Sequence, residues 1–198
     1  MNSEVARAGL VPARRAVVAR RIVAAGLGAL VVALSAQIVV PVPSSPVPMT
    51  LQPLAVVAVG GLLGGTAGLG ALVLYLACGI AGLPVFAAGG SGVARLLGPT
   101  GGYLLAFPVA AWITGMLTTS VLRSDRRVPA GVLRVLLACA VGMVIIHVGG
   151  VAQLALLGGD TSLAFRMGFV PFLTGDLIKV GLAAMLILVA GPKIRSLL

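Results

Sequence analysis

The segment Ile22-Val-Ala-Ala-Gly-Leu-Gly-Ala-Leu-Val-Val-Ala-Leu-Ser-Ala-Gln-Ile-Val-Val40 contains 19 residues and no charged side chain. At 1.5 Å per residue, a helix over it would be about 28 Å long, enough to cross the hydrocarbon core of a bilayer. Five arginines precede it: Arg7, Arg14, Arg15, Arg20 and Arg21. A cleaved signal peptide ending near Ser35 is the alternative. Because the apolar run continues to Val40, a membrane-spanning helix is favoured.

The composition extends this conclusion to the whole chain. Of the 198 residues, 60% are hydrophobic and 9% are charged, whereas soluble domains have about 25% charged residues. Four carboxylates and one histidine are too few polar groups to cover a water-facing surface. The composition excludes a soluble globular domain and a disordered chain, and it predicts an all-α, polytopic integral membrane protein.

The number of spans follows from the charge pattern. Uncharged or nearly uncharged stretches at 100–122, 135–157 and 171–191 each have spanning length, and the glycine-interrupted stretch 51–84 is either two short helices or one long, broken helix. With six spans and a cytoplasmic N-terminus, eleven of the fourteen Lys and Arg residues lie on the cytoplasmic side. With five spans, seven of these Lys and Arg residues would lie inside and six outside, with Lys179 within a span. The positive-inside rule therefore selects six transmembrane helices with both termini cytoplasmic.

This topology predicts one membrane domain over residues 1–198 in a multi-pass protein of the cell membrane, surrounded by lipid. Its expected parts are a basic cytoplasmic segment at 1–20, outer loops at 41–50 and 84–99, and a basic cytoplasmic loop at 123–134. The net charge of +10 does not indicate nucleic acid as a partner, because the basic residues flank the spans.

Several chemistries are excluded by what the motifs lack. No lysine follows a glycine run as a phosphate-binding loop requires, so nucleotide binding is rejected. Cys78 and Cys139 both fall within predicted spans, and there is no CxxC pattern. A single histidine without a neighbouring Cys or Glu predicts no metal site. We expect no cofactor, no catalytic residues and no enzymatic activity.

Asp176 and Lys179 are the most informative residues, because they lie in the last predicted span, three positions apart and hence on one helical face. An ionised group at mid-bilayer costs about 2.5 to 3.5 kcal/mol on insertion scales, so such groups usually face a cavity or a partner. A purely structural ion pair is the alternative. His147 lies in the middle of the fifth span, where a proton relay, a ligand contact and a hydrogen bond between helices all remain open.

Aromatic residues gather at the predicted outer side: Phe86, Tyr103, Phe165, Phe169 and Phe172. An interfacial aromatic belt explains such a distribution, but Phe86 and Tyr103 flank the glycine-rich connection and are better pocket candidates. A cavity with apolar rings, one carboxylate and one or two cations suits a small amphipathic anion.

The first span contains alanines at four-residue spacing, Ala25, Ala29 and Ala33. Small residues at this spacing allow another helix to approach closely. They indicate either a docking face for a second membrane protein or packing within the chain.

Four stretches together resemble the BioY family, the biotin-binding S subunits of energy-coupling-factor transporters. They are Pro48-Met-Thr-Leu-Gln-Pro53, Gly82-Leu-Pro-Val-Phe-Ala-Ala-Gly-Gly90, Leu96-Leu-Gly-Pro-Thr-Gly-Gly-Tyr-Leu104 and Pro171-Phe-Leu-Thr-Gly-Asp-Leu-Ile-Lys179. The resemblance implies six helices, a biotin pocket near the outer face under the first outer loop, and contact of the small residues of span 1 with a transmembrane coupling subunit that works with two cytoplasmic ATPases.

The resemblance also assigns pocket residues. It places Asp176 and Lys179 in the pocket, and Gln52 in the first motif is counted with them. The aspartate would accept hydrogen bonds from the ureido N–H groups and a cation would pair with the valerate carboxylate, while Phe86 and Tyr103 would pack against the bicyclic body.

Two positions depart from the family pattern. Arg95 stands where many relatives have an aliphatic residue, and His147 stands where a tyrosine is frequent. Arg95 as the carboxylate partner is therefore our own inference, beside Lys179. The alternatives are an S subunit for another small vitamin and, from a different class, an intramembrane hydrolase that uses His147.

Overall fold

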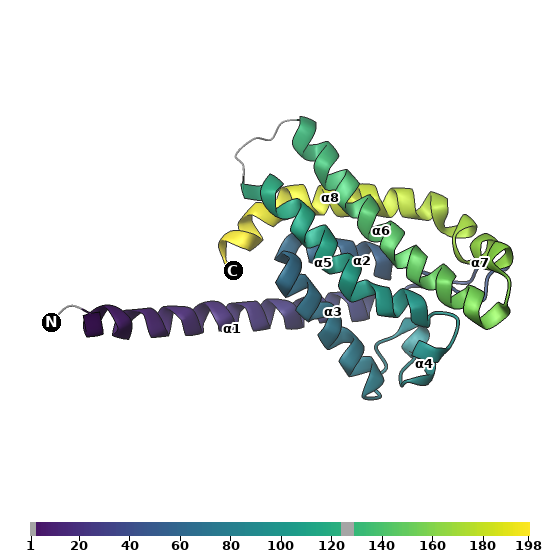
Figure 1. Ribbon diagram of the computed structural model, residues 1–198, viewed down its shortest axis with the longest axis horizontal. Helices are drawn as coiled ribbons and strands as arrows, with labels where there is room; N and C mark the ends of the chain where they lie inside the picture. The colour runs from purple at the N-terminus through teal and green to yellow at the C-terminus, as the bar shows by residue number, and fades with distance from the viewer. Residues whose placement is uncertain (1–2, 124–128) are drawn as a thin grey trace.

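The computed structural model describes the backbone of residues 3–123 and 129–198 and the side chains of residues 17–122 and 130–198. The chain is mostly helical (Figure 1). The α-helices are α1 (Ser3–Ser35), α2 (Gln52–Leu63), α3 (Gly65–Ile80), α4 (Ala94–Leu97), α5 (Gly101–Arg123), α6 (Pro129–Gly158), α7 (Thr161–Gly168) and α8 (Leu173–Ser196). Two 3₁₀ turns, η1 (Ala87–Gly89) and η2 (Val170–Phe172), and two short strands, β1 (Val39–Val40) and β2 (Met49–Thr50), complete the fold.

Four helical segments are long and apolar enough to cross a membrane: Val17–Ser35, Gly101–Leu122, Ala130–Gly158 and Thr161–Ser196. The stretch that the sequence left open forms two helices, because Gly64 adopts a φ of +90° between α2 and α3. With 12 and 16 residues, these helices extend about 18 and 24 Å, less than the roughly 30 Å of a hydrocarbon core. The described residues thus form four helical segments of spanning length and two shorter apolar helices.

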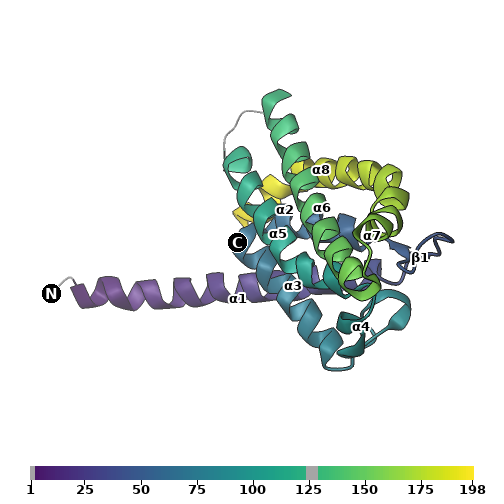
Figure 2. The same ribbon diagram turned by 45° about the vertical axis from the view of Figure 1, so that its right-hand side comes forward.

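The first span ends earlier than the sequence indicated. The prediction placed its end at Val40, but α1 ends at Ser35 and Val39–Val40 pair in antiparallel fashion with Met49–Thr50. The β-branched pair before Pro41 favours extended backbone, and the residue before a proline is disfavoured in a helix. The proline-rich segment 41–48 therefore becomes the tip of a small hairpin, which projects beside α7 (Figure 2).

The alanine row of α1 packs within the chain. Ala29 is only 8% exposed, and Ala25 and Ala33 are half-buried against the hydrophobic core. The outward surface of α1 consists instead of large apolar side chains that are all at least half exposed: Ile22, Val23, Leu27, Leu30, Val31 and Leu34. Of the two interpretations left open by the sequence, these contacts favour packing within the chain.

Close helix contacts hold the centre of the bundle together. A Cβ added at Gly102 of α5 would meet the Gly149 carbonyl oxygen of α6, and a Cβ at Gly149 would meet the Gly102 carbonyl oxygen. Gly60 of α2 lies in the same way against the backbone of Ala111. These glycines let backbones approach one another directly, which is typical of helices packed in membranes.

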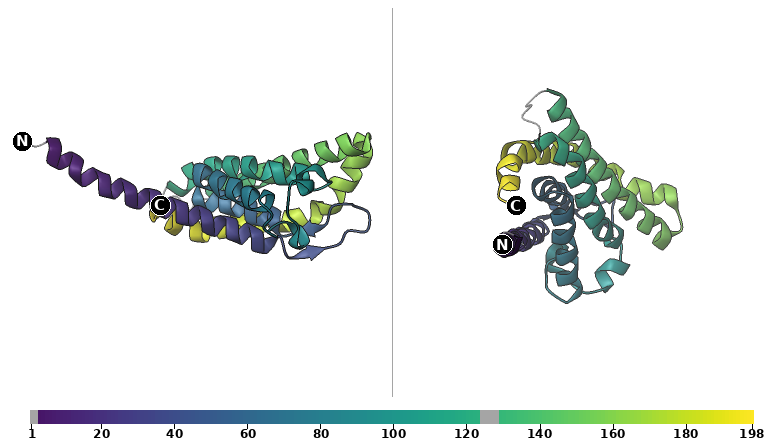
Figure 3. Two further views of the ribbon diagram at one scale, coloured as in Figure 1. Left: turned by 90° about the horizontal axis from the view of Figure 1, so that it is seen from below. Right: turned by 60° about the vertical axis from the view of Figure 1, so that its left-hand side comes forward.

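The β1–β2 hairpin, the connection that contains α4, and helix α7 gather at one end of the bundle, which we call the loop end. The termini lie towards the other end, beyond which the N-terminal part of α1 extends (Figures 1 and 3). The predicted outer loop 84–99 contains η1 and α4. Most of the predicted basic loop 123–134 is helical, with Arg134 exposed on α6, and its residues 124–128 lie outside the described part of the chain. The loop end is where the candidate pocket residues converge.

Candidate functional site

A cavity of about 50 Å³ lies at the loop end of the bundle. It is enclosed by the β1–β2 hairpin, the start of α2, the connection between α3 and α5, and helices α5, α6 and α8. Its lining residues are Val47, Pro48, Thr50, Gln52, Phe86, Ala87, Arg95, Thr100, Tyr103, Leu104, Phe107, His147, Phe172 and Asp176. Segments that are far apart in the sequence therefore form one site.

Six of the seven predicted pocket residues line this cavity: Gln52, Phe86, Arg95, Tyr103, His147 and Asp176. Lys179 does not line it. Its side chain is buried one helical turn beyond Asp176, and its Nζ donates a hydrogen bond of 2.9 Å to Asp176 Oδ1. The lysine therefore supports the carboxylate from outside the cavity.

The carboxylate of Asp176 lies between two basic side chains from different helices. Lys179 Nζ contacts Oδ1, and His147 Nε2 of α6 is 3.1 Å from Oδ2. All three residues are only 5% exposed. Buried ionic groups are tolerated when they are paired in this way. The sequence singled out each residue but did not predict that His147 and Asp176 meet.

The contact between His147 and Asp176 joins α6 to α8. His147 Nε2 lies 3.1 Å from Asp176 Oδ2, a distance that allows an Nε2–H group to donate to the carboxylate. The other ring nitrogen, Nδ1, lies 3.1 Å from the Met143 carbonyl oxygen. Within the described residues, Oδ2 is buried and the histidine ring is the basic group that contacts it. A carboxylate oxygen has more than one lone pair, so Oδ2 can accept a further hydrogen bond from a ligand in the cavity.

Aromatic rings surround these polar atoms. His147 packs edge-to-face with Tyr103 and Phe169, at centroid distances of 6.0 and 5.1 Å, and lies 6.1 Å from Phe172. Tyr103 is held in place because its hydroxyl donates a 2.6 Å hydrogen bond to the Gly168 carbonyl. Of the outer phenylalanines, Phe172 lines the cavity. Phe169 does not line it but packs against His147, which does. Phe165 is exposed and stacks on Phe169.

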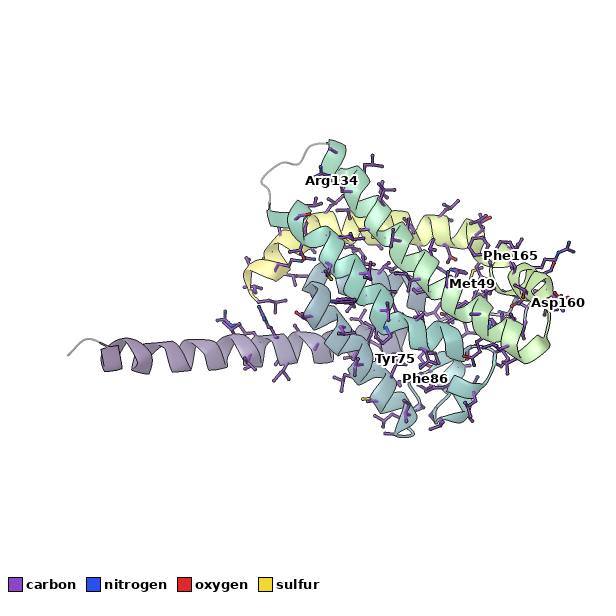
Figure 4. All side chains as sticks on the ribbon, in the orientation of Figure 1. Met49, Tyr75, Phe86, Arg134, Asp160 and Phe165 are labelled. Atoms are coloured by element: carbon purple, nitrogen blue, oxygen red, sulfur yellow. The ribbon has the colours of Figure 1, made fainter. Side chains whose placement is uncertain are left out.

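A second series of hydrogen bonds holds the part of the cavity wall that contains Gln52 and Phe86. Gln52 Nε2 donates to the Tyr75 hydroxyl at 2.6 Å, and this hydroxyl donates to the Val85 carbonyl at 3.2 Å. The Tyr75 ring packs edge-to-face with Phe86 at 5.5 Å, and the two lie side by side in Figure 4. Because Gln52 both lines the cavity and anchors the loop through Tyr75, it connects the start of α2 to the connection that presents Phe86.

Arg95 is the cation at the edge of the cavity. Its guanidinium lies directly over Gly90, where an added Cβ would be only 2.5 Å from Nε and 2.8 Å from Cζ. No hydrogen-bond acceptor for this guanidinium is found among the described side chains and backbone. Arg95 is exposed, so its charge is available to an anion at the cavity mouth.

Several lining residues were not identified from the sequence. Thr50 and Thr100 stand within the quoted motifs, which could have indicated them, and Phe107 and Leu104 follow Tyr103 on the same helix. Val47 comes from the proline-rich loop that was expected only to cover the pocket. Apolar residues such as these carry no individual signal, because the whole chain is apolar.

The site can bind a small amphipathic molecule with a polar N–H group at one end and a negative charge at the other. Asp176 Oδ2 would accept from the N–H, Arg95 would pair with the anion, and the rings would enclose the body between them. Among the described residues, no three His, Cys, Asp or Glu side chains come together as metal ligands.

Comparisons with known proteins identify one family. The family model described as the BioY family matches residues 5–196. The biotin transporter BioY of Thermotoga maritima is 36% identical over 169 residues, which cover 85% of this chain and 94% of that protein. The probable biotin transporter BioY of Pyrococcus horikoshii is 36% identical over 141 residues, which cover 71% of this chain and 78% of that protein.

A solved structure has the same fold. The crystal structure of an S-component for biotin from an ECF-type ABC transporter superimposes with a TM-score of 0.76 at 25% sequence identity, over 90% of this chain and 92% of the other. Its helices therefore follow the same path through nearly the full length of both chains. By the family match over almost all of its residues, and by a relative that is 36% identical and covered to 94% of its length, this chain is a member of the BioY family.

Proposed function

We propose that this membrane protein takes up biotin as the biotin-binding S subunit of an ECF-type transporter. The observation that supports this most directly is the buried carboxylate of Asp176, which lines the cavity and can accept a hydrogen bond there. A ureido N–H is a donor of the required kind. The BioY family consists of transporters and not enzymes, so the intramembrane hydrolase is set aside.

Asp176 and Lys179 have different roles in this proposal. Asp176 binds the ureido group, and Lys179 orients the carboxylate through its contact with Oδ1. Arg95 is the proposed partner of the valerate carboxylate, because it reaches the cavity whereas Lys179 does not. Phe86, Tyr103 and Phe172 are proposed to pack against the bicyclic body.

The cavity is small for biotin, and we propose that part of its wall moves when biotin binds. Its volume of about 50 Å³ is below the roughly 300 Å³ or more that is typical of sites for such ligands. The hairpin residues Val47 and Pro48 and the loop residues Phe86 and Ala87 belong to connections and not to helices of spanning length. We propose that these connections are the parts of the wall that move when biotin binds.

We propose further that the protein lies in the cell membrane with six spans and both termini cytoplasmic, α2 and α3 forming the two short spans. Both termini lie towards the same end of the bundle, as an even number of spans requires (Figure 3). A transmembrane coupling subunit and cytoplasmic ATPases are the proposed partners. Because the alanine row is packed within the chain, the outward apolar face of α1 is the part of that helix open to such a partner.

A direct binding experiment tests the function. Purified protein in detergent should retain radiolabelled biotin with nanomolar affinity, and unlabelled biotin should displace it. Thiamine or riboflavin in large excess should not. Retention of radiolabelled thiamine or riboflavin, with no retention of biotin, would identify an S subunit for another vitamin.

Replacing Arg95 with glutamine should weaken biotin binding about ten- to hundredfold, since a charge-assisted contact with the carboxylate is lost. Biotin amide, which lacks the negative charge, should bind the variant and the unchanged protein equally. The measurement is equilibrium binding of both ligands. Arg166→Gln is the matched control, because Arg166 is exposed on α7 and does not line the cavity. An equal loss for both ligands would assign Arg95 a structural role.

A further inference from the structure

Gln37 lies just beyond the end of α1 and reaches across to the connection that contains Phe86. Its Oε1 accepts a 3.0 Å hydrogen bond from the Gly89 backbone N–H. Its Nε2 donates to the Ala33 carbonyl at 3.0 Å and lies 3.4 Å from the Phe86 carbonyl. One amide side chain therefore joins the last turn of α1 to both ends of a short loop segment 49 or more residues away in sequence.

The segment held by Gln37 is a tight turn, Phe86 to Gly90. The Phe86 N–H donates to the Gly90 carbonyl at 2.9 Å and closes the turn. At its tip, Ala88 and Gly89 have left-handed φ angles of 55° and 69°. Glycine adopts this conformation readily, but alanine does not. A turn with an unfavourable residue at its tip needs outside contacts to remain in place.

Both ends of this turn serve the proposed pocket. Phe86 is 1% exposed, lines the cavity and packs on Tyr75, and Figure 4 shows its side chain beside Tyr75. Gly90 provides the flat surface on which the Arg95 guanidinium rests. The position of the turn thus determines where an aromatic wall and a cation of the pocket lie.

We propose that Gln37 is a positioning residue for biotin: by holding the Phe86–Gly90 turn against the bundle, it keeps the pocket closed over the ligand and slows its release. This inference rests on the proposed function. Gln37 does not line the cavity and acts through the turn. It also makes the geometry of the pocket depend on the end of α1, whose segment Val17–Ser35 is the least buried of the four segments of spanning length among the described residues.

Two readouts test the proposal, one of them without ligand. In Gln37→Met, which has similar size but no hydrogen-bonding group, amide hydrogen exchange of the 86–90 segment should become roughly five- to tenfold faster, as expected for the loss of two hydrogen bonds. Bound radiolabelled biotin should dissociate faster by a similar factor. Gln37→Glu keeps an acceptor for the Gly89 N–H but lacks the donor. Its exchange and dissociation rates should therefore lie between those of the unchanged protein and those of Gln37→Met.

Thermal stability and a control variant separate positioning from general damage. The midpoint of unfolding of Gln37→Met should equal that of the unchanged protein, because Gln37 is exposed at a helix end. Leu34→Ala, on the outward face of the same helix, should alter neither exchange nor release. Unchanged exchange, or release within twofold of normal, overturns the proposal. Absence of biotin retention by the unchanged protein, with faster exchange in Gln37→Met, would instead contradict the proposed function and leave the role of Gln37 in the turn standing.

Discussion

Asp176→Asn should reduce the affinity for biotin by a factor of about one hundred or more, equivalent to about 2.7 kcal/mol. The amide oxygen of asparagine can replace Oδ1 as the acceptor for Lys179, which turns the amide NH₂ towards the cavity. A donor would then face the ligand donor, and the charge that strengthens the hydrogen bond would be lost. Equilibrium binding of radiolabelled biotin measures the effect.

Loss of folding has to be distinguished from loss of recognition in this variant, because removing one partner leaves the other charge buried and uncompensated. The double variant Asp176→Asn/Lys179→Met removes both charges. It should restore thermal stability but not biotin binding. Asp160→Asn is the matched control, since Asp160 is an exposed carboxylate that caps α7 through the Leu163 N–H, and asparagine caps equally well. Normal biotin affinity in either Asp176 variant would exclude the aspartate from recognition.

Gly102→Ala should destabilise the protein by about 1 to 3 kcal/mol and lower its melting temperature by roughly 3 to 10 °C. The added methyl would meet the carbonyl oxygen of Gly149 and the Cβ of Gln153. Neither group can move aside without separating α5 from α6. Because Tyr103 is the next residue and His147 lies on the opposing helix, biotin affinity should fall as well. Thermal unfolding in detergent and ligand binding measure the two effects.

Gly70→Ala provides the comparison for this substitution. Gly70 lies in the interior of α3, is exposed, and has no atom within 4 Å of an added Cβ. Alanine is favoured over glycine in a helix by about 1 kcal/mol, so this variant should be as stable as the unchanged protein or slightly more stable. A similar loss of stability in both variants would mean that the Gly102–Gly149 contact has no special role.

Much of the site was predictable because polar residues are rare in this chain. In an apolar sequence with four carboxylates, an aspartate and a lysine within a span stand out, and six of the seven predicted residues line one cavity. The cost of placing charge in lipid makes such residues informative. Lys179 was predicted as a ligand contact. It lies three residues after Asp176 on the same helix, and its ammonium group pairs with the Asp176 carboxylate and does not line the cavity.

Other features could not be predicted because they depend on contacts between distant segments. That His147 faces Asp176 requires α6 to pack beside α8, and the anchoring of a loop by Gln37 requires α1 to end at Ser35 and not at Val40. The alanine row shows the same limit. Its spacing indicates close packing, but the sequence does not say whether the neighbouring helix belongs to this chain or to another.

Composition and the order of charged and apolar stretches are sufficient to establish a helical membrane protein and its candidate polar residues, because transfer of charge and of unpaired backbone into lipid costs several kcal/mol for each group. Packing determines which of these residues meet and which of them line the cavity. Those properties depend on distances of about 3 Å between helices, and no pattern along one chain specifies them.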